Sequence, residues 1–269
     1  MEYSKLKSGT DIRGEACENP QGLPVTLTDE VVEAIAGAFL KWCEKRLGHP
    51  AEGLRIAVGR DSRISGPRIL EALKRVFIRY GVQGLDCGLA STPSMFMAVK
   101  NLPCHCSVQI TASHHPFYRN GLKFFTEEGG LDSPDISEIL AYAQQGLCPE
   151  KECPGAWEEV CHMQTYAQGL REQIKREVNG EDYDHPLKGL HIVVDAGNGA
   201  GGFYAGEVLE LLGADVSGSQ FLEPDGMFPN HIPNPEDKEA MASISQAVVR
   251  AKADLGVIFD TDVDRGAAV

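Results

Sequence analysis

The sequence contains no long hydrophobic run. No stretch approaches the eighteen or so consecutive apolar residues that a membrane-spanning helix needs. The first five residues, Met1 to Lys5, include two charges and lack the apolar core of a signal peptide. We therefore expect a cytoplasmic protein with no membrane partner.

Cysteine and positive charge are also scarce. The 8 cysteines in 269 residues are too dilute for a disulfide scaffold, and Cys104-His105-Cys106 has no second ligand pair at zinc-site spacing. Lys and Arg number 25 against 39 Asp and Glu, a formal charge of −14. Such a charge repels nucleic acid, so we expect no nucleic-acid partner. It would also repel a phosphorylated ligand, so any phosphate site must be local, built from a few cationic side chains and backbone N–H groups.

What the sequence does contain is a regular alternation of strand and helix patterns. This alternation predicts α/β structure with helices on both faces of a sheet. Thr28 is placed to cap the first long helix, and Pro93 stands where another helix could begin. The expected helices are 29–47, 67–80, 133–145, 160–178, 203–212 and 237–252, and the expected strands are 54–58, 82–87, 105–111, 121–126, 190–195 and 255–259.

The chain divides near its middle. Residues 146–155 contain two prolines, two glycines and no periodicity, which is typical of a linker. A weak repeat supports two similar halves, because 54–59 and 190–195 each precede a turn, a helix ending in glycine (Gly81 or Gly213) and another strand. We expect domains at 1–152 and 153–269. The expected architecture is two tandem three-layer α/β/α domains with mixed, mostly parallel sheets.

Residues 111–116, Thr-Ala-Ser-His-His-Pro, are the first candidate site. Ser113 follows a predicted strand, where ligands usually bind in open α/β sheets. His114 and His115 could accept or donate a proton, and Lys123 lies just down the chain. A serine hydrolase is not indicated, because Ser113 is not in a G-x-S-x-G motif. An ordinary polar loop stays open as the alternative.

The second candidate is the run Asp260-Thr-Asp262-Val-Asp264-Arg265, directly after an apolar strand. In an extended segment alternate side chains point the same way, so the three carboxylates would converge. They would repel one another unless a cation lay between them, and oxygen ligands favour Mg²⁺, Mn²⁺ or Ca²⁺. The alternatives are a solvated acidic turn and a phosphatase with an aspartate nucleophile, which would need only two of the aspartates.

The third candidate is the glycine-rich turn at 197–202, which fits G-x-G-x-x-G between a strand and a helix. Read literally, this pattern indicates dinucleotide binding. No acidic residue is placed at the end of the next strand to bind a ribose, because Asp215 begins that strand. We therefore favour a tight strand-to-helix turn.

Taken together, five motifs in this order resemble the α-D-phosphohexomutase superfamily, in particular its phosphomannomutase/phosphoglucomutase branch. The resemblance extends over the whole chain. The five motifs are 9–14 (Gly-Thr-Asp-Ile-Arg-Gly), the serine motif 111–116, 120–123 (Asn-Gly-Leu-Lys), the proline-rich stretch 223–235 and the aspartate run 260–265.

The resemblance implies a mutase that interconverts hexose 1-phosphate and hexose 6-phosphate, with mannose or glucose as the sugar. Ser113 would carry a phosphoryl group and pass it to the hexose phosphate substrate by way of a hexose 1,6-bisphosphate. The resemblance also implies roles for further residues: Mg²⁺ held by Asp260, Asp262, Asp264 and the phosphorylated Ser113; Thr10 and Arg265 as phosphate-binding residues; and His114, Lys123 and Arg13 as catalytic residues. We favour His114 or Lys123 for the proton, because arginine is a poor base, and give Arg13 an electrostatic role.

The sequence departs from the family in two respects. Thr261 and Val263 stand where the family's metal loop often has glycine, although an extended loop needs no glycine backbone angles. Family members also continue into third and fourth domains, so we expect this chain to be a truncated, poorly active fragment without domains III and IV. Two other functions stay open: a non-catalytic module that binds metal and phosphate, and a phosphoglucosamine mutase.

Overall fold

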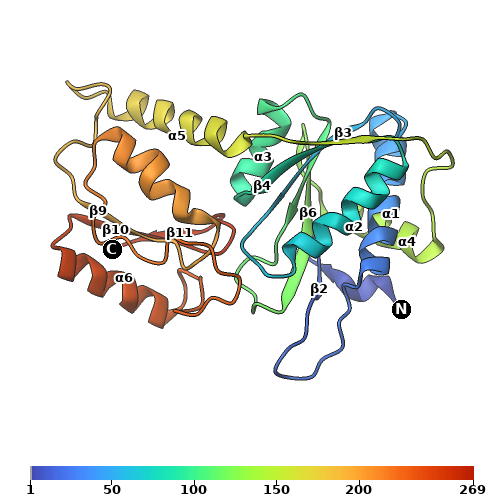
Figure 1. Ribbon diagram of the computed structural model, residues 1–269, viewed down its shortest axis with the longest axis horizontal. Helices are drawn as coiled ribbons and strands as arrows, with labels where there is room; N and C mark the ends of the chain where they lie inside the picture. Colours follow the sequence, from blue (N-terminus) through green and yellow to red (C-terminus); the bar gives the residue numbers. More distant parts are fainter. Residues whose placement is uncertain (1) are drawn as a thin grey trace. The chain divides into compact units, whose positions relative to one another are not determined.

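The computed structural model describes residues 2–269, which form two compact units (Figure 1). Within the described residues, unit 1 comprises residues 2–60, Ile64–Gly88 and Met95–Val160. Unit 2 comprises Cys161–Val269 and also takes in two short segments of the first half, Asp61–Arg63 and Leu89–Ser94. A domain boundary between residues 152 and 153 stays a prediction.

Unit 1 is built on one mixed sheet. Its strand order is β1-β2-β6-β5-β3-β4-β8, and β7 pairs with β6. The pairs β3–β5 and β4–β8 are parallel, whereas β6 runs antiparallel to both β2 and β5. The strands are β1 Lys7–Ser8, β2 Asp11–Glu15, β3 Arg55–Arg60, β4 Gln83–Leu89, β5 Cys106–Ile110, β6 Arg119–Thr126, β7 Gly129–Gly130 and β8 Ala156–Glu159.

The helices of unit 1 begin and end at residues with the expected chemistry. Thr28 accepts a hydrogen bond from the Val31 N–H at the start of α1, and Gly48 ends that helix in the left-handed region. Asp132 and Asp135 form a reciprocal capping box at the start of α4. The helices are α1 Asp29–Leu47, α2 Gly66–Arg79, α3 Thr92–Asn101, whose first three residues belong to unit 2, and α4 Ser133–Gln145, with a short 3-10 helix η1 at Tyr3–Leu6.

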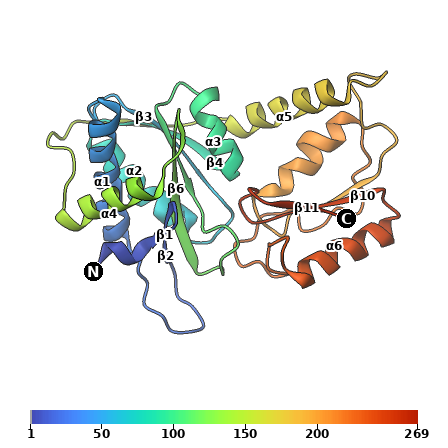
Figure 2. The same ribbon diagram turned by 180° about the vertical axis from the view of Figure 1, so that it is seen from behind.

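Two neighbouring phenylalanines show the three-layer arrangement of unit 1. Successive side chains of a strand point to opposite faces of the sheet. Phe124 of β6 packs on Phe39 of α1, with ring centroids 4.5 Å apart. Phe125 packs on Phe96 of α3, with ring centroids 5.9 Å apart. The sheet therefore has α1 on one face and α3 on the other, as both views of the ribbon show (Figures 1 and 2).

Unit 2 repeats this plan on a smaller sheet. Strands β11-β10-β9 form it, with β10 parallel to β9 and antiparallel to β11. On β9, Ile192 and Val194 face a cluster with the helical segment 204–212, while Val193 faces a cluster with α6. The elements are α5 His162–Val178, β9 Ile192–Asp195, η2 Ala200–Gly202, η3 Tyr204–Leu209, η4 Glu210–Leu212, α6 Lys238–Ala251, β10 Leu255–Phe259 and β11 Gly266–Ala268. The predicted α/β class is thus confirmed.

Two details of unit 2 differ from expectation. The segment predicted as one helix over 203–212 is helical but is a π-helix (η3) followed by a 3-10 turn (η4). The strand expected after Gly213 is reduced to two isolated bridges, His191–Asp215 and Asp195–Gln220. Gly218 lies between these bridges in the left-handed region, which turns the chain away from an extended path.

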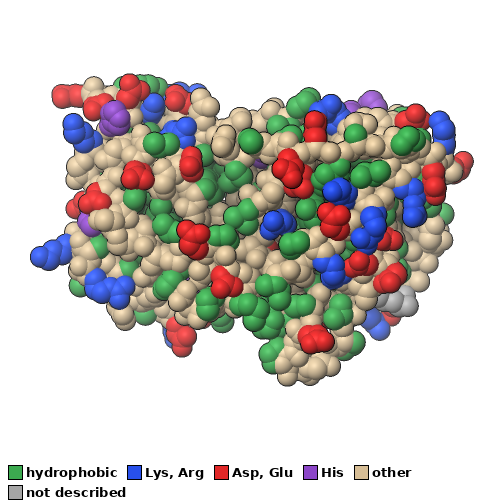
Figure 3. Space-filling view, viewed as in Figure 1, with side chains coloured by type: hydrophobic (Ala, Val, Ile, Leu, Met, Phe, Trp, Pro, Cys, Tyr) green, Lys and Arg blue, Asp and Glu red, His purple; other side chains and the backbone are tan. Residues whose placement is uncertain are grey.

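Charges of both signs are interspersed on the face of unit 1 that carries α2 (Figure 3). Arg75 of α2, for example, forms ion pairs with Asp29 and Glu33 of α1. Pairing of this kind is typical of a solvated helix surface. Within residues 2–269, every helix is too short or too polar to cross a membrane.

Candidate active site

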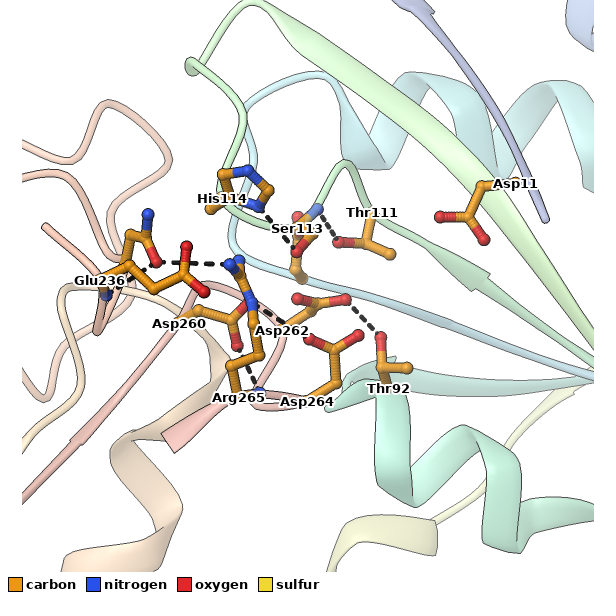
Figure 4. Close-up of polar contacts among 12 residues, drawn as sticks. Asp11, Thr92, Thr111, Ser113, His114, Glu236, Asp260, Asp262, Asp264 and Arg265 are labelled. Atoms are coloured by element: carbon orange, nitrogen blue, oxygen red, sulfur yellow. Dashed lines mark hydrogen bonds and ion pairs between the residues drawn. The ribbon is translucent and has the colours of Figure 1, made fainter. Parts of the chain in front are cut away.

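The serine loop, residues 111–116, leaves the carboxyl end of β5 in unit 1. The ladder with β6 continues one residue into it, because the Thr111 N–H donates to the Gly121 carbonyl oxygen at 3.0 Å. The Thr111 hydroxyl then accepts a hydrogen bond from the Ser113 N–H at 2.8 Å (Figure 4). Ser113 is 4% exposed. The loop therefore holds its serine close to the strand end on a hydrogen-bonded turn.

Ser113 adopts a backbone conformation that few side chains prefer. Its φ is 52°, in the left-handed region. Its hydroxyl oxygen lies 3.4 Å from Nδ1 of His114, whose ring stacks on that of His115 with centroids 5.0 Å apart. Backbone outliers of this kind cost free energy and cluster at functional sites. The arrangement places a titratable ring beside the serine hydroxyl.

Arg13 and Lys123 share one face of the unit 1 sheet. Arg13 of β2 pairs in register with Gly121 of β6, and Lys123 lies two residues further along β6, so both side chains point the same way. A Cβ at Gly121 would lie 2.2 Å from the Ile12 carbonyl oxygen and 2.9 Å from that of Thr111, so only glycine fits there. Because Gly121 has no side chain, β2 and the start of the serine loop both lie close to it. Arg13 and Thr111 are therefore both neighbours of Gly121.

Asp11 and Thr10 complete this part of unit 1. The Arg13 guanidinium donates to the Asp11 carboxylate at 2.6 Å. Thr10 is exposed in the two-residue turn between β1 and β2, where Gly9 has a φ of 65°. Among the residues predicted for unit 1, Ser113 and His114 are in contact, Arg13 and Lys123 share a sheet face, and Thr10 lies on the surface.

The aspartate loop, residues 260–265, follows β10 in unit 2. One ligand oxygen from each of Asp260, Asp262 and Asp264 lies within 4.8 Å of the others. Asp260 and Asp262 are completely buried, and Asp264 is exposed. Among residues 2–269 this is the one group of three or more His, Cys, Asp or Glu side chains with the spacing of a metal site. The predicted convergence of the three carboxylates is confirmed.

The reason given for that convergence is wrong. The aspartate loop is not extended: the Val263 N–H donates to the Asp260 carbonyl oxygen at 3.2 Å, which closes a turn. Val263 has a φ of 67°, in the left-handed region that an extended loop would avoid. The side chains converge because the backbone curls around them. A β-branched residue is strained in this conformation, and the family's frequent glycine would not be.

Arg265 is held against Asp260. Its backbone N–H donates to Oδ1 at 3.1 Å, and its guanidinium donates to Oδ2 from two nitrogens at 2.8 and 3.1 Å. Even so, burial and the charges of Asp262 and Asp264 raise the pKa of Asp260 to about 7. One arginine does not offset the repulsion among three carboxylates, which a bound cation would relieve. The donor set fits a hard divalent cation that prefers oxygen ligands.

The glycine-rich turn at 197–202 packs against the aspartate loop. The Ala200 N–H donates to the Thr261 carbonyl oxygen at 2.8 Å. A Cβ at Gly199 would lie 2.6 Å from that same oxygen, so the absence of a side chain is what permits the contact. The close approach to Thr261 explains the glycine at position 199, and the turn supports the aspartate loop. Sequence reasoning identified the turn but not this role.

Two other contacts of unit 2 were missed. Thr92, far away in sequence, donates its hydroxyl to Asp262 Oδ2 at 2.6 Å (Figure 4). His231, in the proline-rich stretch 223–235, lies 3.0 and 3.1 Å from the two carboxylate oxygens of Asp195. The second contact had one partial signal along the chain, because Asp195 ends a buried strand and His231 interrupts a proline-rich loop.

Both halves of the chain match profiles of one protein family. Residues 5–147 match the family profile of phosphoglucomutase/phosphomannomutase, alpha/beta/alpha domain I. Residues 164–269 match the profile of alpha/beta/alpha domain II of the same family. The chain belongs to the phosphoglucomutase/phosphomannomutase family, which confirms the resemblance drawn from the five motifs.

Individual relatives bear related names. The chain is 34% identical over 250 residues to a phosphoglucomutase of Neisseria gonorrhoeae, covering 89% of this chain and 49% of that protein. It is 36% identical over 213 residues to a phosphoglucosamine mutase of Bifidobacterium animalis subsp. lactis, covering 78% and 46%. A phosphoglucomutase/phosphomannomutase family protein of Burkholderia thailandensis superposes with a TM-score of 0.82 at 25% identity, over 100% of this chain and 55% of that one. The chain thus spans about half the length of the relatives it matches.

Proposed function

We propose that the chain supplies the phosphoryl-carrying and metal-binding domains of a phosphohexomutase. Ser113 carries the phosphoryl group, and Asp260, Asp262 and Asp264 hold Mg²⁺. The observation that carries the proposal is the aspartate triad, two of its members fully buried, whose ligand oxygens lie within 4.8 Å of one another. A solvated acidic turn would leave such carboxylates in water.

Phosphoryl transfer depends on positioning and charge neutralisation more than on covalent chemistry by the protein. When the Ser113 Oγ–P bond breaks, a hydroxyl oxygen of the hexose phosphate forms the new O–P bond. The proton of that hydroxyl passes to His114 or Lys123, and the departing Ser113 oxygen takes up a proton. His114 is favoured by its Nδ1, which lies 3.4 Å from the Ser113 oxygen. Arg13 stays protonated and offsets negative charge.

The proposed cation supplies positive charge that offsets the roughly −1.5 to −2 charge of a phosphoserine. Arg265 holds Asp260 in place through its bidentate contact. Its guanidinium and Thr10 are the proposed phosphate-binding groups.

The names of the relatives support a proposal for the substrate class. These act on glucose, mannose or glucosamine phosphates, as phosphoglucomutase, phosphomannomutase/phosphoglucomutase and phosphoglucosamine mutase. We propose a hexose phosphate as the substrate, with the hexose 1,6-bisphosphate as intermediate. A hexosamine phosphate is a second candidate, favoured by the 36% identity to the phosphoglucosamine mutase.

Phosphate transfer to the protein tests the proposal. Purified chain is incubated with the 1,6-bisphosphates of glucose, mannose and glucosamine, with Mg²⁺ or with EDTA, and the intact mass is measured. We expect one added phosphoryl group, dependent on Mg²⁺ and mapped to Ser113 by peptide sequencing. The bisphosphate that reacts fastest identifies the sugar. Phosphate on another residue, or none with any bisphosphate, would favour the non-catalytic module.

A further inference from the structure

We infer that Thr92 is a positioning residue for the metal ligand Asp262, through a contact that no part of the aspartate loop itself provides. The inference rests on the proposed metal site and names a further residue of it. Thr92 precedes Asp262 by 170 positions in the sequence. It lies in Leu89–Ser94, one of the two short segments that belong to unit 2 although their neighbours along the chain belong to unit 1.

Thr92 contacts Asp262 twice. Its hydroxyl donates to the carboxylate Oδ2 at 2.6 Å, and its backbone N–H donates to the Asp262 carbonyl oxygen at 2.8 Å. One bond fixes where the backbone of residue 262 lies, and the other fixes how the carboxylate is rotated. Both residues are buried, Thr92 at 7% exposure and Asp262 at 0%. A buried carboxylate held in this way presents its other oxygen in a set direction.

The segment that carries Thr92 is itself fixed. The Ser94 hydroxyl donates to the Ser91 carbonyl oxygen at 2.7 Å, and the Ser94 N–H donates to the Ser91 hydroxyl at 3.2 Å. His162, the first residue of α5, has Nε2 2.7 Å from the Ser94 carbonyl oxygen. A carbonyl oxygen only accepts, so Nε2 carries the hydrogen. Burial lowers the pKa of His162, which keeps the ring neutral.

Hydrogen-bonding partners of metal ligands orient those ligands, and their loss typically lowers metal affinity by about 10–100-fold. Thr92 has the features of such a partner: a short bond to one carboxylate oxygen, burial, and an anchored backbone. A purely structural threonine would need the methyl group for packing, and the hydroxyl would be dispensable for cation binding. The two roles therefore differ in which substitution is tolerated.

The experiment compares Thr92→Val, which keeps the shape and loses the hydroxyl, with Thr92→Ser, which keeps the hydroxyl and loses the methyl. Thr126→Val, a partly buried threonine of β6, is the matched control. Mg²⁺ affinity is measured by calorimetry, and Mn²⁺ binding by loss of the free-ion paramagnetic resonance signal. Circular dichroism and thermal unfolding verify that each variant is folded.

We expect Thr92→Val to lower the affinity for both cations by about 10–100-fold. Thr92→Ser and Thr126→Val should bind both cations as tightly as the wild type. Should Thr92→Val bind as tightly as the wild type, or Thr92→Ser bind as weakly as Thr92→Val, the hydroxyl has no positioning role and the inference fails. If the wild type itself binds neither cation, the proposed metal site fails, and the inference falls with it. The wild-type titration thus separates the two failures.

Discussion

The serine loop of unit 1 and the aspartate loop of unit 2 have the same local design. Each leaves the carboxyl end of a strand, and each contains one non-glycine residue in the left-handed region, Ser113 or Val263. They differ in what holds them. The serine loop is fixed by neutral hydrogen bonds to its own strand neighbours. The aspartate loop is fixed by an arginine, by Thr92 and by contact with a glycine-rich turn, around charges that repel one another.

Because of this difference, we expect changes in the serine loop to alter reactivity and changes in the aspartate loop to alter stability. Unit 1 has a large core drawn from α1, α2, α4 and strands β2, β3, β5 and β6, so losing the serine hydroxyl should change reactivity and leave the fold intact. Unit 2 has a three-stranded sheet with smaller apolar clusters and a buried charged loop. Its stability should depend on electrostatic partners and on a cation.

The largest effect is expected at Ser113. In Ser113→Ala, phosphoryl transfer from a hexose 1,6-bisphosphate to the chain should fall by at least about 10³-fold, because the variant has no oxygen to form the O–P bond. Intact mass and the rate of incorporation measure this. Unfolding followed by tryptophan fluorescence reports unit 1, since both tryptophans, Trp42 and Trp157, belong to it, and should be nearly unchanged.

Ser137→Ala is the matched control, an exposed serine of α4. It should accept phosphate at the wild-type rate. If Ser113→Ala is phosphorylated as readily as Ser137→Ala, the serine loop does not carry the phosphoryl group.

The success of the sequence prediction depended on how local the signal was. Helix α4 is predicted to the residue, because Asp132, Asp135 and Gly146 specify both of its ends within the segment itself. The aspartates were found for the same reason, since their spacing is visible along the chain. The left-handed Val263 was missed because nothing in a short run of residues distinguishes a turn from an extended loop.

Contacts between distant segments could not be predicted. Thr92 and Asp262 are 170 residues apart, and Asp195 and His231 are 36 apart. No periodicity or spacing relates such pairs, because they are fixed only when the strands and helices pack. The strand expected after Gly213 failed for a related reason: its sequence is compatible with pairing, but the chain turns at Gly218 and pairs only at two bridges.

The next largest effect is expected at the Asp195–His231 pair, on the stability of unit 2. The imidazole is 3% exposed and the carboxylate completely buried. Removing one member of a buried charged pair leaves the other uncompensated and typically costs about 3–5 kcal/mol. His231→Ala should lower the free energy of unfolding of unit 2 by this order. Hydrogen exchange in peptides covering β9 measures it, and tryptophan fluorescence should show unit 1 unaffected.

The pH dependence of the same pair sharpens this test. Burial lowers the pKa of His231, but hydrogen bonds to Asp195 and to the Ile232 carbonyl oxygen raise it more, so its net pKa is raised. A raised pKa stabilises the folded state below the unfolded pKa of about 6.5. That stabilisation is lost as pH rises through the folded value. The protection of β9 from hydrogen exchange should therefore fall with rising pH in the wild type and change less in His231→Ala. An equal dependence of protection on pH in the two proteins would contradict the charged pair.

A smaller effect is expected at Asp262. Asp262→Asn should weaken Mg²⁺ binding by about 10–100-fold, because the amide keeps a hydrogen-bond acceptor for Thr92 but removes the charge that attracts the cation. Calorimetric titration measures the affinity. Asp264→Asn is the comparison. Its Mg²⁺ affinity should fall less than that of Asp262→Asn, since Asp264 is exposed and its charge is partly screened by water. Equal Mg²⁺ affinities in Asp262→Asn and the wild type would favour the alternative interpretation, an acidic turn that binds no cation.

The smallest effect is expected at Val263, where the two loops differ most in residue type. A left-handed backbone costs about 1–3 kcal/mol at a poorly suited residue. Glycine removes that cost but adds about 0.5–1 kcal/mol of unfolded-state entropy. It also removes the Val263 side chain, whose Cγ2 would lie 3.4 Å from a Cβ added at Gly201. Val263→Gly should therefore stabilise unit 2 by no more than about 1 kcal/mol, whereas Val263→Ala, which keeps a Cβ, should gain less. Exchange in peptides covering β10 measures both. If Val263→Gly instead destabilises unit 2 by more than Val263→Ala does, the valine packs better than its backbone angle implies. The side chain of Val263 would then determine the shape of the aspartate loop. Val263 would stabilise its loop despite the left-handed backbone, whereas the left-handed backbone of Ser113 costs free energy in the serine loop.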